Sequence, residues 1–249
     1  MRLSPDIALV GSGAFGFDIS SPMDAHTFLL DGGDELALFD AGSGGTIGDT
    51  ELILQNARDD GFDLDRITRL FLTHYHFDHM GGAAEMRDRL GLTVHASPIA
   101  ARALAAGDED AISLSGAKAA GFVPDDYHLK PCPAEANLVE GTKFTVGRLT
   151  VTVFETPGHA AGHVSFLVEG GERRLLVQGD VVFAGGTIFL QNVPDCSLQA
   201  YCESVRKLNE LEFDAFLPGH LSISLRDGKR HISAAAAQFA KLLVPRNLI

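Results

Sequence analysis

Short apolar runs separated by glycine-rich turns divide the chain into two halves with a similar order of elements. In the first half, the apolar runs at residues 26–42 and 67–74 predict a hairpin and a further strand. Residues 50–61 and 81–91 have helical spacing, and residues 93–97 indicate a short strand. The first half is therefore expected to contain a sheet and helices.

The second half repeats this order. Residues 143–159 predict two strands around a turn at Gly147, and residues 163–180 predict a hairpin. Residues 198–211 form an amphipathic helical pattern, and residues 215–220 indicate a last short strand. Strands with helices in each half favour a β-sandwich covered by helices on both outer faces.

No clean linker separates the halves, so residues 1–249 are expected to form a single domain. The segment 98–137 interrupts the rhythm and is too long for a simple connection, so it is a candidate substrate cover. In helices 50–61 and 198–211 the apolar positions predict the packed face. These positions are Leu52, Ile53, Leu54 and Ala57 in the first helix, and Leu198, Tyr201, Val205 and Leu208 in the second.

Composition narrows the function. The chain has 249 residues, 45% of them hydrophobic, and a net charge of −13 from 33 acidic and 20 basic side chains. This balance argues against a nucleic-acid surface, which needs clustered cations, and favours a small-molecule substrate. We expect a cytoplasmic protein without a membrane segment, because neither a signal peptide nor a spanning run is evident. The three cysteines are expected to be reduced thiols, and a homo-oligomeric state is left open.

The most concentrated chemistry lies in the stretch "LTHYHFDHMGG", residues 72–82. His74 and His76 alternate, and Asp78 and His79 follow directly, so the side chains can converge on two points rather than one. Imidazole nitrogens and carboxylate oxygens without thiolate suit Zn²⁺, with Fe or Mn as alternatives. The stretch therefore predicts a site for two metal ions.

Three further motifs each end a predicted strand with a ligand-type side chain. "TPGH" ends at His159, "QGD" at Asp180 and "LPGH" at His220. Loops that leave strand ends on a rigid scaffold commonly build functional sites. These three residues are therefore candidate partners of the histidine-rich stretch.

With these motifs, the sequence resembles the metallo-β-lactamase-fold hydrolase superfamily, in its glyoxalase II-like and lactonase-like branch. The resemblance implies an α+β fold, an αββα sandwich of two mixed β-sheets packed face to face with helices outside. It also implies two Zn²⁺ ions and seven ligands. The first metal would be held by His74, His76 and His159, the second by Asp78, His79 and His220, and Asp180 would bridge them.

The expected reaction is hydrolysis of an ester, thioester or lactone bond of a small metabolite. Two cations roughly 3.5–4 Å apart would share a water whose pKa falls from about 15.7 toward about 7, giving a metal-bridging hydroxide. Asp78 could also orient this nucleophile and so act as the catalytic residue. Asp40 is a candidate partner for the second nitrogen of a ligand histidine. By the resemblance, His163 lies near the site without binding metal.

Several branches of the family stay open. The segment after Asp180 is similar to glyoxalase II-like thioesterases, whereas the Phe-rich loop at residues 11–25 is similar to lactonases that open acyl-homoserine lactones. Those lactonases carry a tyrosine where this chain has Phe183. A single-iron persulfide dioxygenase, a β-lactamase and a non-catalytic binding module are the remaining alternatives. Phe15, Phe17 and Phe183 are candidates for a substrate lid.

Overall fold

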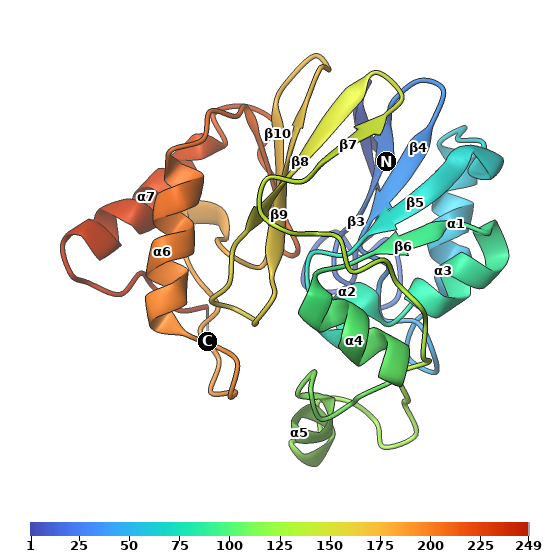
Figure 1. Ribbon diagram of the computed structural model, residues 1–249, viewed down its shortest axis with the longest axis horizontal. Helices are drawn as coiled ribbons and strands as arrows, with labels where there is room; N and C mark the ends of the chain where they lie inside the picture. The colour runs from blue at the N-terminus through green and yellow to red at the C-terminus, as the bar shows by residue number, and fades with distance from the viewer. Residues whose placement is uncertain (249) are drawn as a thin grey trace. The chain divides into compact units, whose positions relative to one another are not determined.

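The computed structural model describes residues 1–248 and divides the chain into two compact units, Met1–Leu138 and Val139–Ile249. Each unit contains one β-sheet with its own helices (Figure 1). Within residues 1–248, no helix has both the length and the apolar character needed to cross a bilayer. The single domain expected for residues 1–249 stays a prediction.

The first unit is built on a six-stranded mixed sheet in which the spatial order of the strands follows the chain. The first four strands pair antiparallel, and the last three run parallel to one another. Parallel neighbours bring their carboxyl ends to the same edge. The strands are β1 (Arg2–Ser4), β2 (Ile7–Gly11), β3 (Thr27–Asp31), β4 (Leu36–Phe39), β5 (Ile67–Phe71) and β6 (Thr93–His95).

The helices of this unit begin and end at residues suited to those places. Asp49 accepts a hydrogen bond from the Leu52 backbone N–H and so caps the first helix, and Gly91 and Gly107 end two others in the left-handed conformation. The helix at residues 50–59 packs on β2, and the helix at residues 83–90 packs on β5 and β6. The helical segments are α1 (Thr50–Asp59), η1 (Leu64–Arg66), α2 (Phe77–Met80), α3 (Ala83–Leu90), α4 (Pro98–Ala106) and α5 (Leu114–Ala119).

The second unit contains a five-stranded mixed sheet with the order β11-β10-β9-β8-β7. Only the β10–β11 pair is parallel, and the other pairs are antiparallel. Because β8, β10 and β11 all run in the same direction, their carboxyl ends lie along one edge. The strands are β7 (Lys143–Val146), β8 (Leu149–Glu155), β9 (Val164–Glu169), β10 (Leu175–Gly179) and β11 (Ala215–Pro218).

Two helices, α6 (Leu198–Asn209) and α7 (Lys229–Ala240), pack on each other in this unit, and η2 (Ala184–Gly186) packs on α7. Tyr201, Val205 and Leu208 of α6 join one apolar cluster with side chains from β9, β10, β11 and α7. Burial of this α6 stripe attaches the helix to its sheet.

The fold predictions are confirmed in their main lines. Each predicted strand and helix named above is present, and both sheets are mixed. Two packing predictions are wrong: Leu52 and Leu198 lie in the first turn of their helices and are partly exposed rather than packed. Apolar spacing alone does not show which positions of a first helical turn are exposed: Thr50, in the same turn as Leu52, is buried.

The two leucines of α6 give a matched test of this packing. Leu208 is fully buried and Leu198 is 38% exposed. Leu208→Ala should lower the free energy of unfolding by about 2–5 kcal/mol, because it leaves a cavity. Leu198→Ala should change it by less than about 0.5–1 kcal/mol. Urea denaturation of both variants measures the difference, and equal losses would contradict the assigned core.

Candidate active site

In the first unit, the candidate ligands follow the carboxyl end of β5. Phe71 is the last strand residue, and the extended segment after it carries His74 and His76 before the chain turns into the short helix α2 with Asp78 and His79. His74 and His79 are buried, whereas His76 and Asp78 are partly accessible. The first unit thus brings together all four predicted ligands of the histidine-rich stretch.

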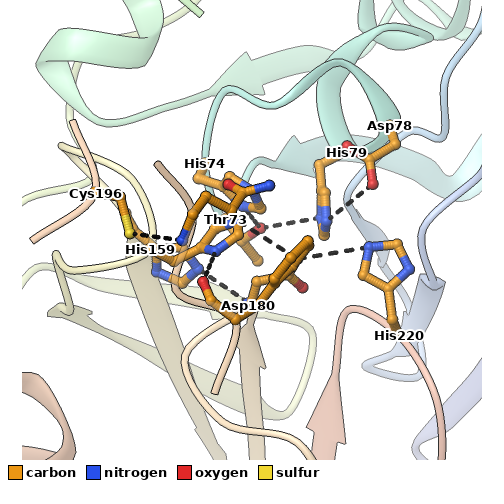
Figure 2. Close-up of polar contacts among 12 residues, drawn as sticks. Thr73, His74, Asp78, His79, His159, Asp180, Cys196 and His220 are labelled. Carbon is orange, nitrogen blue, oxygen red and sulfur yellow. Dashed lines mark hydrogen bonds and ion pairs between the residues drawn. The ribbon is translucent and has the colours of Figure 1, made fainter. Parts of the chain in front are cut away.

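These side chains lie close to one another. The ring centroid of His74 lies 4.6 Å from that of His76 and 4.1 Å from that of His79. Nε2 of His79 lies 3.7 Å from Oδ2 of Asp78. Figure 2 marks this pair with a dashed line. That separation is long for a hydrogen bond but suits two atoms that bind one cation.

Asp40 holds two of these histidines in place. It follows β4, whose end lies beside that of β5 because the two strands are parallel. Its carboxylate lies 2.8 Å from Nδ1 of His79 and accepts hydrogen bonds from the backbone N–H (2.8 Å) and hydroxyl (2.9 Å) of Thr73. The Thr73 hydroxyl also lies 3.0 Å from Nδ1 of His74. The hydrogen bond predicted between Asp40 and a candidate ligand histidine is therefore present.

This arrangement fixes the tautomers. A carboxylate can only accept, so Nδ1 of His79 carries a proton, and in the neutral ring Nε2 keeps a lone pair. The Thr73 hydroxyl gives its one proton to Asp40 and therefore accepts from His74, whose Nε2 is left in the same state. Thr73 was missed by the sequence analysis. Its signal was its place between the strand and the first histidine of the motif.

In the second unit, three parallel-directed strands deliver the other three predicted ligands. His159 follows β8, Asp180 follows β10 and His220 follows β11, all at the same edge of the sheet. Gly158 makes the turn before His159 with φ of +146°, and a Cβ there would lie 2.7 Å from the backbone of Tyr201. Only glycine fits this position.

Asp180 lies between the two histidines of this unit (Figure 2). Its Oδ2 is 3.5 Å from Nε2 of His159 and 3.5 Å from Nε2 of His220. Two atoms bound tetrahedrally to one Zn²⁺ at about 2.0–2.2 Å lie roughly 3.3–3.6 Å apart. The spacing of these donors therefore fits ligands of shared cations better than partners in a hydrogen bond.

The orientation of His159 strengthens this interpretation. Its Nδ1 lies 3.1 Å from the backbone carbonyl of Phe189, which can only accept, so Nδ1 carries a proton. In the neutral ring, Nε2 then presents a lone pair to the Asp180 carboxylate. A cation between them turns this repulsive arrangement into a favourable one. The donor set of imidazoles and carboxylates, without thiolate, suits Zn²⁺, Fe or Mn.

His163, the residue immediately before β9 (Val164–Glu169), contacts Asp180. It accepts a hydrogen bond at Nε2 from the Asp180 backbone N–H (3.2 Å), and its Nδ1 lies 3.0 Å from the Thr156 hydroxyl. Because the backbone N–H can only donate, His163 is protonated at Nδ1 and orients the Asp180 backbone. His163 is thus buried and bonded to the Asp180 backbone, and its expected place beside a metal site without binding metal stays a prediction.

The loop with Phe15 and Phe17 is hydrogen-bonded, at its C-terminal end, to the histidine-rich motif. The Ala25 backbone N–H donates to the carbonyl of Asp78 (3.1 Å), and Asp24 accepts from the backbone N–H (2.8 Å) and hydroxyl (2.6 Å) of Ser43. At the other end of the loop, Phe15 is 66% and Phe17 41% exposed. Such a loop can present apolar rings to a substrate.

The insertion at 98–137 also contacts the histidine-rich motif. Its Tyr127 is buried, donates a hydrogen bond to the Ser43 carbonyl (2.7 Å), and packs edge-on against Phe77 of the motif with ring centroids 5.8 Å apart. Burial raises the pKa of Tyr127 well above its usual value, so the phenol stays a donor. Both candidate covers are therefore attached to the segment that carries the predicted ligands.

Phe183 requires a correction. It is 0% exposed and its ring lies beside that of His220, with centroids 6.5 Å apart. A fully buried ring forms a wall of the unit and not an exposed lid. The sequence could not distinguish these roles because the position three residues after Asp180 fixes only the neighbourhood.

The family model described as "Metallo-beta-lactamase superfamily" matches residues 21–220. An atrochrysone carboxyl ACP thioesterase of Aspergillus fumigatus is 30% identical over 195 residues, covering 78% of this chain and 50% of that protein. A hydroxyacylglutathione hydrolase of Cereibacter sphaeroides is 29% identical, covering 73% of this chain and 55% of that protein. The chain spans about half the length of these relatives.

A solved metallo-beta-lactamase from Cronobacter sakazakii has a TM-score of 0.71 with this chain at 20% identity, covering 97% of this chain and 93% of the other. At this identity the match shows the fold alone. Together with the two mixed sheets, it confirms the predicted fold class.

Asp40→Asn tests the support of the histidines. Asparagine keeps the shape and tolerates the positive φ of 60° at this position, but its amide N–H₂ faces donors where the carboxylate accepted. We expect Zn²⁺ affinity, measured by chelator competition, to fall about 10–100-fold. Asp63→Asn, at the exposed cap of η1 in the same unit, is the control. Equal affinities for Asp40→Asn and the native protein would contradict the role of Asp40.

Proposed function

Because the chain belongs to the metallo-beta-lactamase superfamily, we propose that it is a dinuclear metal-dependent hydrolase that cleaves a thioester, ester or lactone of a small metabolite. Small metabolites with an acyl group are the proposed substrates, and thioesters are the first choice.

One observation carries this proposal: a single oxygen of Asp180 lies 3.5 Å from Nε2 of both His159 and His220. A buried carboxylate is costly unless cations or hydrogen-bond donors compensate its charge. An oxygen shared equally by two imidazoles is where a carboxylate that bridges two cations would lie. Two cations, one beside each imidazole, are the form of this arrangement that we propose.

The proposed assignment divides the seven side chains between two positions. Three imidazoles would hold one cation, two imidazoles and a carboxylate would hold the other, and the remaining carboxylate would contact both. In that order, they are His74, His76 and His159; Asp78, His79 and His220; and Asp180.

Bound at this place, two divalent cations would supply a water of lowered pKa and polarise the scissile carbonyl. The chain's own residues would do the remaining work. The Asp78 carboxylate is 18% exposed, the most accessible of the two candidate ligand carboxylates, so it can accept a hydrogen bond from the attacking water and orient it. Asp40 and His163 would hold the ligand side chains and so limit their motion when substrate binds.

The thioester preference is supported by the relatives. One is named a thioesterase and another a hydroxyacylglutathione hydrolase, and both match over about three quarters of this chain. The lactonase alternative has less support, because Phe183 provides no hydroxyl for a ring ester. A cytoplasmic location stays a prediction from the sequence.

A direct experiment combines metal analysis with a substrate screen. Purified protein should contain two equivalents of zinc and hydrolyse a model thioester faster than a lactone, a β-lactam or a phosphodiester, and a chelator should abolish the activity. One equivalent of iron with oxygen consumption on a persulfide would favour the dioxygenase instead. Metal-free protein with full activity would refute the proposal.

Asp180→Ala is the sharpest substitution at this centre. Removing the shared carboxylate should lower metal content below two equivalents and reduce kcat by at least about 10²-fold, because the cations lose the anion between them. Asp214→Ala, a half-exposed carboxylate bonded to the Arg174 N–H in the same unit, is the control. Two retained metals and a native kcat in Asp180→Ala would show that the assignment is wrong.

The Phe-rich loop predicts a different kinetic signature. Phe15→Ala and Phe17→Ala should raise KM for thioesters with long apolar acyl groups by about 3–10-fold, corresponding to a lost contact of roughly 1 kcal/mol, and change kcat little. Leu52→Ala, another partly exposed apolar residue of the unit, is the control. A KM that is unchanged across a series of acyl lengths would remove the lid function of this loop.

A further inference from the structure

The backbone carbonyl of Phe189 holds His159 in its orientation, and it does not belong to either sheet. This carbonyl lies 3.1 Å from Nδ1 of His159 and 2.9 Å from the hydroxyl of Tyr201. The Phe189 ring also packs against the His159 ring, with centroids 5.6 Å apart. The direction of Nε2 in His159 therefore depends on where residues 188–190 lie.

Residues 188–190 are held by the C-terminal segment of the chain. Ile188 and Asn247 form an isolated parallel bridge outside the named strands. The Ile188 N–H donates to the Arg246 carbonyl (3.0 Å), and the Leu248 N–H donates to the Ile188 carbonyl (2.9 Å). These two bonds fix the residue immediately before Phe189.

The residue after Phe189 is fixed by one side chain. Oδ1 of Asn247 accepts the Leu190 N–H (2.9 Å), and its Nδ2 donates to the Leu190 carbonyl (3.1 Å). A side-chain amide is the group that can satisfy a backbone N–H and C=O of the same residue at once. Phe189 is thus bracketed on both sides, while its own carbonyl stays directed at His159.

We propose that Asn247 is a positioning residue for His159, acting through the Leu190 backbone and the Phe189 carbonyl. This inference rests on the proposed role of His159 as a metal ligand. The C-terminal segment would then support the metal centre indirectly, without contacting the metal. Such support would strengthen metal binding, because the hydrogen bond to the non-ligating nitrogen orients the ring and makes it a better donor.

The test uses imidazole NMR signals and metal affinity in the full-length protein. In ¹⁵N-histidine-labelled metal-free protein, the Nδ1–H of His159 is hydrogen-bonded to Phe189, and that of His79 is bonded to Asp40 and serves as the internal reference. Asn247→Ala should shift or broaden the His159 signal and leave the His79 signal unchanged. Its Zn²⁺ affinity should fall about tenfold, the lower end of the range for supporting residues.

Two variants serve as comparisons. Asn247→Asp keeps an acceptor for the Leu190 N–H and should lose less affinity than Asn247→Ala. Asn209→Ala removes the same side chain from a bond with Ser233 (2.8 Å) in the same unit and should change neither signal nor affinity. A loss as large in Asn209→Ala as in Asn247→Ala would show a general effect on the unit and overturn the inference.

His159→Ala separates this inference from the proposed function. If His159→Ala loses Zn²⁺ affinity while Asn247→Ala keeps the native His159 signal and affinity, the positioning role is overturned and the metal centre stands. If His159→Ala binds Zn²⁺ as the native protein does, His159 is not a ligand, and both the assignment and the inference fall.

Discussion

The shared oxygen of Asp180 is the constraint on which the proposed centre depends. It lies equally far from two imidazole nitrogens in a place where only 3% of the Asp180 side chain is exposed. The hydrogen bond from Nδ1 of His159 to the Phe189 carbonyl means that, in the neutral ring, Nε2 directs a lone pair toward this oxygen. In a buried place, cations at the proposed metal positions would compensate the charge of this carboxylate.

The direction of the strands explains why the donors converge within each unit. In the first unit, β4 and β5 are parallel, so Asp40 and the histidine-rich segment leave the sheet side by side. In the second unit, β8, β10 and β11 run the same way and deliver His159, Asp180 and His220 to one edge. The supporting contacts of Thr73, His163 and Phe189 then fix the rings. Strand direction thus brings the candidate ligands together within each unit, and the supporting contacts set the orientation of their rings.

The sequence predicted what depends on local order and missed what depends on distant contacts. The strand ends that carry His159, Asp180 and His220 were identified because apolar runs and turns are local signals. Thr73 was missed because it matters only when Asp40 lies beside it, and Asn247 because its partner Leu190 is far away in the chain. Leu198 and Phe183 were placed wrongly because spacing does not show how far the neighbouring elements bury a residue in a first helical turn or in a loop.

The central claim is that Asp180 lies between two cations. X-ray diffraction from crystals of the zinc-loaded protein, with anomalous scattering measured at the zinc edge, tests it most directly. We expect two zinc peaks roughly 3.5–4 Å apart, each about 2 Å from an Asp180 oxygen. A single peak, or two peaks with Asp180 directed away from both, would contradict the account.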